Sequence, residues 1–453
     1  MKKIKFFAVL LILILTLSIV VYGQDNTQEG TVVISYARAV ELANSTLQDM
    51  DDILYEMREL QDELRADLRR LERGDWRSET MHALFEELGQ LEIQLFFALQ
   101  GQLELQNNIQ LSMQDVLAGF ANPEDASLLH ISLQSAIAGI MAAQGAGGNM
   151  AMMQNRIADI FEEIMRLQDG TQVREMADAI RGALQEMDDQ MAVMRINHQQ
   201  SQLVVENLLR GLIITVVELE ATIEDTKANL VLTEENLRQV RIQHGFGLVS
   251  NNDLRTAQRT LTLEQMGLTR QQTSLYNARN NLNYLLGQPL LQHTKIEFNR
   301  VLPEISEDLA AHINEIIPTT PTIRLIQMDV DREYAAMRAY RGSNREKRDA
   351  LRETYENAIQ RRNQAKLTME ANLRRAYNEL SNLINQKEAH LLELYRTKQT
   401  LEVAETNLGL GRITRHEVAQ AQQAMSRAKQ TIESTLNQMW TLAFRLDNPS
   451  LLN

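Results

Sequence analysis

The feature that most constrains this chain is a pattern that occurs twice, 164 residues apart. Leu230–Gln258 has apolar residues at three- and four-residue spacing, then a glycine turn, then a second helical segment. Leu394–Gln422 repeats this order without a gap. Identical pairs include Leu209/Leu373, Arg210/Arg374, Leu219/Leu383, Glu224/Glu388, Leu230/Leu394, Thr233/Thr397, Leu237/Leu401, Gly247/Gly411, Ala257/Ala421 and Gln258/Gln422. We interpret the repeat as the internal duplication of a long helical hairpin.

Long helices are predicted on both sides of each glycine turn. No proline interrupts residues 171–246, where apolar residues keep helical spacing, so one helix of about 110 Å is expected. Gly287 followed by Pro289 marks the end of its return helix. The predicted long helices are 171–246, 253–286, 344–410 and 414–446, and shorter helices are predicted at 46–73, 308–317 and 322–340. Aromatic residues make up only 5% of the chain, which also favours long helices over an ordinary globular core.

The duplication divides the chain into a first repeat, 24–290, and a second repeat, 291–453. The first repeat opens at Thr31–Asn44, where Ser35 is a plausible helix N-cap. The two repeats differ in length because the first contains an insert at 77–170. This insert separates two segments that the second repeat joins directly.

The structure of the insert is left open by its pattern. Leu91–Met113 is apolar at nearly every odd position, which indicates a strand, but its Gln, Leu and Glu residues are good helix formers. Met150, Met152 and Met153 fit either adaptable apolar packing or a site for a soft metal ion. We favour a helical insert whose methionines serve packing.

The N-terminus has the layout of a secretory signal. Lys2, Lys3 and Lys5 precede an apolar run, Phe6–Val21, and Gly23 supplies a small residue before a cleavage point ahead of Gln24. Residues 1–23 are therefore predicted to direct export as a signal peptide, and an uncleaved membrane anchor is the alternative. The chain has no cysteine, which excludes disulfides and thiolate metal sites.

Enzymatic and nucleic-acid-binding functions find no support in the residues. The formal net charge is −14, which is opposite to the basic surface that nucleic acid requires. The eight histidines never fall at metal-ligand spacing, and neither a nucleophile elbow nor a phosphate-binding loop occurs. We therefore expect no catalytic residue, no cofactor, no metal site and no nucleic-acid partner.

The duplicated order of motifs resembles the TolC-type outer-membrane efflux family, the outer-membrane channel component of efflux and type I secretion systems. In the first repeat the resemblance lies in Ala37–Ala43, in Gly247–Ser250 with Asp253, and in Leu285–Leu290. The second repeat matches less well, through Gly411–Thr414, Glu417-Val418, Ala421-Gln422 and a degraded end at Asp447–Pro449.

The resemblance implies a mainly all-α fold, in which duplicated antiparallel hairpins form a coiled-coil or α-barrel cylinder. It implies a homotrimer in the outer membrane and periplasm, docked on a periplasmic adaptor (a membrane-fusion protein) and an inner-membrane transporter. The chain would then be a membrane-associated conduit that carries substrates across the cell envelope. The alternative is an exported structural coiled-coil protein of the envelope with no transport role.

The chain departs from the family where membrane strands are expected. Members of the family carry strands between the short and the long helix of each repeat, but here only Arg341–Asn344 lies between them in the second repeat. Two spanning strands need about 9–11 residues each, so they do not fit. We therefore predict little or no β-barrel.

The two glycine turns are the candidate docking site. Apolar residues occur where turns are normally polar, and exposed apolar groups of this kind mark interaction sites. The candidate tip residues are Phe246, Gly247, Leu248, Val249, Ser250, Gly411, Ile413 and Thr414. Asp253 and Glu417 are candidates for acids that face a lumen, and the alternative is that they stabilise the first turn of a helix. The alternative to a docking role is that both glycines only end their helices in the left-handed conformation.

Overall fold

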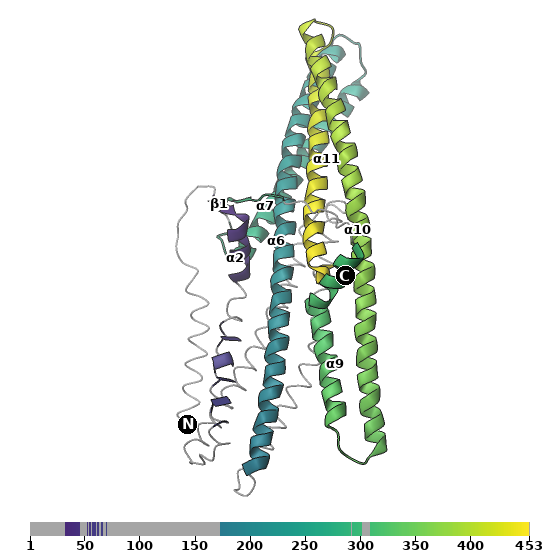
Figure 1. The fold of residues 1–453 in the computed structure, drawn as a ribbon. Helices are drawn as coiled ribbons and strands as arrows, with labels where there is room; N and C mark the ends of the chain where they lie inside the picture. The colour runs from purple at the N-terminus through teal and green to yellow at the C-terminus, as the bar shows by residue number, and fades with distance from the viewer. Residues whose placement is uncertain are drawn as a thin grey trace, which may run out of the picture.

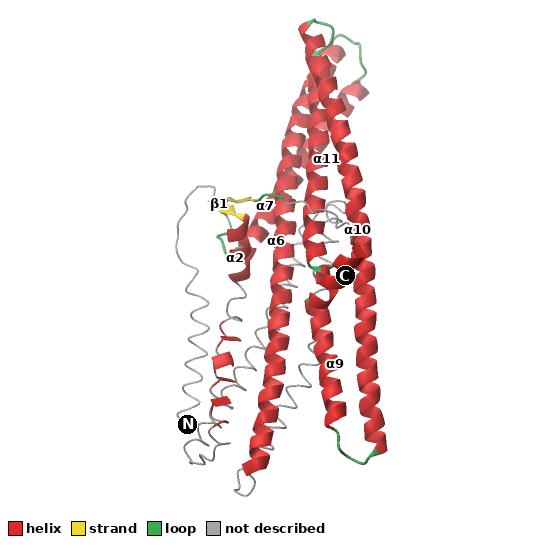
Figure 2. Cartoon of the chain, viewed as in Figure 1, coloured by secondary structure: helices red, strands yellow, loops and turns green. Residues whose placement is uncertain are grey.

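The chain is dominated by four long helices in the computed structural model, which describes residues 32–45, scattered positions between 52 and 69, 173–290, 292–300 and 309–452. The long helices are α6 (Val173–Gly245), α7 (Asn251–Leu285), α10 (Arg345–Gly409) and α11 (Arg415–Asp447). These bounds differ from the predicted ones by one or two residues at each end. The fold is mainly helical, as predicted (Figures 1 and 2).

Shorter elements surround the middle of the long helices. In chain order they are β1 (Val32–Ser35), α2 (Tyr36–Ser45), β2 (Thr294–Glu297), α8 (Leu309–Ile316), the 3-10 turn η2 (Ile317–Thr319), α9 (Pro321–Ala339) and the 3-10 turn η3 (Pro449–Leu451). Strands β1 and β2 pair in parallel, with Val32 opposite Thr294 and Ser35 opposite Glu297. Neither strand was predicted. Ser35 ends β1 and its hydroxyl accepts a hydrogen bond from the Arg38 backbone N–H at 3.3 Å, as the N-cap prediction requires.

The two hairpins lie side by side with their turns at the same end (Figure 1). Each long helix packs on its own return helix, and α6 of the first hairpin packs on α11 of the second. Four hydrogen bonds fix the antiparallel register of α6 and α11. They join Ser426 to Asp225 at 2.6 Å, Asn437 to Glu218 at 3.0 Å, Arg445 to Asn207 at 3.4 Å, and Gln423 to Asn229. Residue numbers fall along α6 as they rise along α11, so the turns after α6 and before α11 lie together. The predicted hairpin geometry is confirmed.

Apolar side chains form two cores at mid-length. One core joins α2, both strands, the middle of α6, the end of α7 and Phe444 of α11, and Leu209 is fully buried in it. The other joins α8, η2, α9, the middle of α10 and the end of α11 around Leu373 and Leu380. Leu209 and Leu373 are equivalent positions of the repeat, so each copy centres its core on the same residue.

An arginine lies inside the first core. The Arg210 guanidinium carbon lies 4.3 Å from the Trp440 ring centroid and 4.2 Å from that of Phe444, and Arg210 also forms an ion pair with Glu206 at 3.1 Å. The Tyr36 hydroxyl donates to the same Glu206 carboxylate at 2.8 Å. Burial is the main cause that raises the pKa of Tyr36 far above its usual value. The Arg210 charge acts against this shift and the Glu206 charge adds to it, and the phenol stays neutral.

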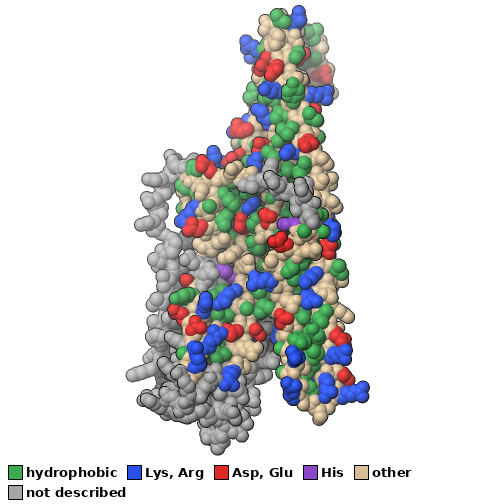
Figure 3. Space-filling model, viewed as in Figure 1, with side chains coloured by type: hydrophobic (Ala, Val, Ile, Leu, Met, Phe, Trp, Pro, Cys, Tyr) green, Lys and Arg blue, Asp and Glu red, His purple; other side chains and the backbone are tan. Residues whose placement is uncertain are grey.

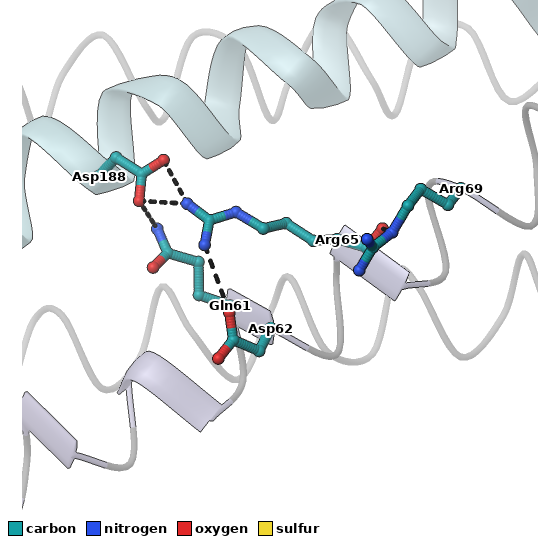
Figure 4. Close-up of polar contacts among 5 residues, drawn as sticks. All are labelled: Gln61, Asp62, Arg65, Arg69 and Asp188. Atoms are coloured by element: carbon teal, nitrogen blue, oxygen red, sulfur yellow. Dashed lines mark hydrogen bonds and ion pairs between the residues drawn. The ribbon is translucent and has the colours of Figure 1, made fainter.

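Both copies continue past the cores, away from the glycine turns, as a second pair of antiparallel helices. In the first copy, the Arg65 Nη2 atom lies 2.6 Å from both carboxylate oxygens of Asp188 on α6, and Gln61 donates to Asp188 at 2.6 Å (Figure 4). In the second copy, Arg362 of α10 donates to Gln327 of α9 at 3.1 Å. We call these pairs the lower hairpins.

The lower hairpins explain the unequal length of the repeats. The two sides of the first are separated in sequence by the insert, whereas Tyr340–Asn344 joins the two sides of the second and contains no strand, as predicted. Predictions for residues 1–23 and 77–170 lie outside the described residues. So does most of the helix expected at 46–73, but every described position within it is helical.

Candidate functional site

The tip of the molecule is formed by the two glycine turns, which have the same backbone structure. Gly247 and Gly411 have φ angles of 71° and 69°, in the left-handed region that favours glycine. The Gly247 N–H donates to the His244 carbonyl and the Leu248 N–H to the Gln243 carbonyl, both at 2.9 Å. In the second copy, the Gly411 N–H donates to the Leu408 carbonyl and the Arg412 N–H to the Asn407 carbonyl, also at 2.9 Å. Each long helix therefore ends in a Schellman motif.

Each return helix begins with a capping box. The Ser250 hydroxyl accepts from the Asp253 N–H at 3.2 Å, and the Asp253 carboxylate accepts from the Ser250 N–H at 2.9 Å. Thr414 and Glu417 form the same reciprocal pair at 3.3 and 2.7 Å. The sequence Ser/Thr-x-x-Asp/Glu thus satisfies two backbone donors at the start of α7 and of α11.

The capping bonds lower the pKa of both acidic candidates. For Asp253 the main cause is the hydrogen bond from the Ser250 side chain, followed by the Ser250 N–H. For Glu417 the main cause is the Thr414 N–H, followed by the Thr414 side chain. Both carboxylates are exposed and charged at neutral pH. Within one chain they stabilise helix ends, which is the alternative role that the sequence left open.

Apolar side chains cover the outermost part of the tip. Phe246 is 77% exposed, Leu248 is 74% exposed and Leu410 is 60% exposed. Val249 and Ile413, one residue further along each turn, are half-buried. The apolar side chains of the two turns therefore comprise a half-buried pair and a set that extends into solvent. Arg412 occupies the position of Leu248 in the second turn, so the two tips are similar in backbone and different in surface chemistry.

A second apolar surface, which the sequence did not reveal, runs along the shaft. The long helices form a row in the order α7, α6, α11, α10, so α7 and α10 lie at its edges. Large apolar side chains are exposed along both edge helices: Leu263, Met266, Tyr276, Tyr284, Leu367, Leu391, Leu392, Tyr395 and Val403. The inner helix α6 exposes only Val231 and Ile242 among its described side chains, and α11 exposes none. Helical periodicity cannot separate a face covered by its own chain from one left open.

No group of three or more His, Asp or Glu side chains is placed to hold a metal ion in the described part of the chain. Among the helices that the structure describes, none combines the length and the apolar character that a membrane span requires.

No protein-family model and no curated protein matches the chain. Among solved structures, it is similar to the outer membrane protein VceC of Vibrio cholerae, with a TM-score of 0.42 and 13% identity over 59% of this chain and 74% of that one. It is similar to CusC with a TM-score of 0.45 and 13% identity, over 77% and 97% of the two chains. It is also similar to the CmeC outer membrane channel of Campylobacter jejuni, with a TM-score of 0.44 and 12% identity over 60% of this chain and 67% of that one.

These solved structures are TolC-type outer-membrane channels, the class that the sequence resembles. At 12–13% identity the likeness concerns the fold alone.

Proposed function

We propose that this chain is one subunit of an envelope conduit, in which three copies close into a helical cylinder that passes substrates along its lumen. The tips dock on a periplasmic adaptor, which connects the cylinder to an inner-membrane transporter. The function is conduction rather than catalysis. The chain is exported and acts at the outer membrane and periplasm.

The observation that carries this proposal is the pair of apolar edge helices. A row of four helices with open apolar faces on α7 and α10 has two different edges, and α7 of one copy can meet α10 of the next. Such a contact is heterologous, so repeated copies either close into a ring or continue as a filament. Burial of large apolar side chains supplies the driving force for this association.

The size of the ring supports three copies. Packed helices lie about 8–10 Å apart, so twelve helices give a circumference of about 110 Å and a centre-line diameter of about 35 Å. A helix with its side chains is about 10 Å across, which leaves a lumen of about 25 Å. Eight helices would leave only about 13 Å by the same geometry. Three copies also agree with the homotrimer that the sequence resemblance implies.

Charge placed on the edges tests the proposal. We expect Leu263→Asp with Leu392→Asp to convert the trimer into monomers with unchanged helical content, because both side chains are exposed in a single chain. Gln239→Glu with Gln422→Glu is the matched control, since it adds the same charge at exposed positions of the inner helices α6 and α11. Light scattering coupled to gel filtration measures the mass. A monomeric wild-type chain would favour the envelope coiled-coil alternative, and a trimeric edge variant would exclude this interface.

A further inference from the structure

The turn between α9 and α10 lies at the end of the molecule opposite the tip (Figure 1). It begins after Ala339 and ends at Arg345, the first residue of α10. Helix α10 has 65 residues, so its start lies about 95 Å from the glycine turn at its other end. Basic side chains gather at this end over the α9–α10 turn (Figure 3).

The charge of this turn is opposite to that of the chain. Residues 338–348 contain five basic side chains and one acid, Glu346, in a protein whose net charge is −14. We call the five the basic turn: Arg338, Arg341, Arg345, Lys347 and Arg348. All five are exposed. A local excess of positive charge is therefore presented to solvent at one end of an acidic molecule.

Among the described residues, the basic turn has one acidic partner. Arg345 forms an ion pair with Asp349 at 3.7 Å, but its side chain is 93% exposed, so solvent screens the pair. Arg338 and Lys347 lie over tyrosine rings, and Arg348 donates to the Gly342 carbonyl at 3.3 Å. Further along α10, by contrast, Arg352 and Arg374 form ion pairs at 2.9 and 2.8 Å with acids one helical turn away.

Helix stability does not explain the charges at the start of α10. The third position of α7 and of α11 carries an acid that caps the helix, whereas the same position of α10 is Lys347. Cations at a helix N-terminus oppose its dipole, whereas Arg338 lies in the last turn of α9, where a cation is favoured. Arg345, Lys347 and Arg348 weaken the start of their own helix, and among the described residues their one acidic partner is screened by solvent, so they are suited to an anion outside the chain.

Tyrosines give the turn an apolar component beside its charge. The Tyr340 ring lies over Gly342, where a Cβ atom would have no room, and the Tyr340 hydroxyl donates to the Asn344 carbonyl at 3.4 Å. The Lys347 amine lies 5.5 Å from the centroid of the same ring. Tyr334, which lies before the turn on α9, is also exposed. Tyrosine rings beside basic residues are typical of membrane–water interfaces.

We propose that the basic turn binds the anionic headgroups of a lipid bilayer, so that the lower end of the molecule rests on a membrane surface. Lysine and arginine close to an anionic bilayer each strengthen binding by roughly fivefold. The proposal stands independently of the conduit function, because it uses only contacts and charges within one chain.

Vesicle co-sedimentation of the full chain tests this proposal. The vesicles contain phosphatidylcholine alone or with phosphatidylglycerol as the anionic lipid. The patch variant is Arg341→Gln, Arg345→Gln and Arg348→Gln. The control variant is Arg238→Gln, Arg255→Gln and Arg259→Gln, which removes the same charge from exposed positions near the opposite end. The wild type and both variants contain the same N-terminal lysines and apolar run, so any membrane binding by that segment cancels when the two variants are compared.

We expect the patch variant to bind anionic vesicles at least 30-fold more weakly than the control variant, which should bind like the wild type. The difference should disappear on neutral vesicles and shrink in high salt, because screening weakens surface charge interactions. Equal binding of both variants to anionic vesicles would overturn the proposal. The proposal would also be overturned if the patch variant bound a DNA duplex more weakly than the control variant while both bound vesicles equally. Circular dichroism at matched concentration confirms that both variants are folded.

Discussion

Arg210 stacks on Trp440, with its guanidinium carbon 4.3 Å from the ring centroid, and thereby joins the first long helix to the last. The equivalent residue of the second copy, Arg374, forms an ion pair with Glu370 at 2.8 Å, just as Arg210 does with Glu206. The Arg210 side chain is only 12% exposed and that of Arg374 is 51% exposed. Equivalent ion pairs of the two copies are therefore placed differently: one is buried beneath aromatic rings, and the other lies on the surface.

This difference predicts unequal effects of the same substitution. Arg210→Ala should lower the free energy of unfolding by about 2–3 kcal/mol, because it removes the stacking and leaves Glu206 partly buried without its partner. Arg374→Ala should cost less than about 0.5 kcal/mol, the usual value of an exposed pair one turn apart. Urea unfolding followed by tryptophan fluorescence measures both. Equal losses would show that the aromatic cluster does not hold the copies together.

The same substitution, glycine to alanine, should have opposite effects on stability in a glycine turn and within a helix. Gly247→Ala should destabilise the protein by about 1 kcal/mol, because alanine is strained at a φ of 71°. Gly267→Ala should stabilise it by about 0.5–1 kcal/mol, since Gly267 lies within α7 and an added Cβ meets open space. Thermal unfolding of the two variants compares them directly. A stabilising change at Gly247 would contradict the turn structure.

The capping acids predict a pH dependence. Hydrogen bonds lower the pKa of Asp253 and Glu417, so each carboxylate stabilises the folded state above the ordinary carboxyl range near pH 4. This contribution is lost as the pH falls through the lower pKa of the folded state. Asp253→Asn with Glu417→Gln should therefore lower the melting temperature at pH 7, and the difference from the wild type should shrink between pH 5 and pH 3. A difference that grows on acidification would contradict the capping role.

The exposed tip residues predict a separation of binding from stability. Leu248→Asp with Leu410→Asp should leave the melting temperature unchanged, because both side chains extend into solvent. The same change should weaken adaptor binding at least tenfold and reduce export, if the tips dock as proposed. Val249→Asp is the contrasting variant, since this half-buried position should lose stability as well. Normal adaptor binding by the Leu248 and Leu410 variant would remove the tip from the docking surface.

The sequence predicted the long helices because their limits depend on local chemistry. A left-handed glycine, a Ser or Thr N-cap and an acid three residues later act within a few residues of each other, and both copies contain all three. The antiparallel hairpins followed from these signals, and the absence of strands at Tyr340–Asn344 followed from the length of that segment. The exposure of Phe246 and Leu248 also followed, because a turn at the end of a long hairpin has no core to enter.

Non-local contacts could not be predicted in this way. Strand β1 pairs with β2 across more than 250 residues of sequence, and four residues of each strand carry too little pattern to reveal that pairing. The burial of Arg210 depends on Trp440, which no local signal connects to it. The open faces of α7 and α10 have the same helical spacing as buried faces, so only the packed structure identifies them as edges.

In the proposed closed ring, α7 of one copy meets α10 of the next. Met266 lies 15 residues from the first residue of α7, and Tyr395 lies 14 residues from the last residue of α10, so both are at the same height below the tip. Because the chain has no cysteine, Met266→Cys with Tyr395→Cys introduces a single pair of thiols. Both positions are exposed, so the substitutions leave the cores intact.

Oxidation of this double variant, followed by denaturing mass analysis, tests for the ring. A closed ring yields a covalent species of three chains, whereas Met266→Cys alone or Tyr395→Cys alone yields none, because the interface pairs unlike helices. A product that stays at one chain, or dimers formed equally well by either single variant, would contradict the ring.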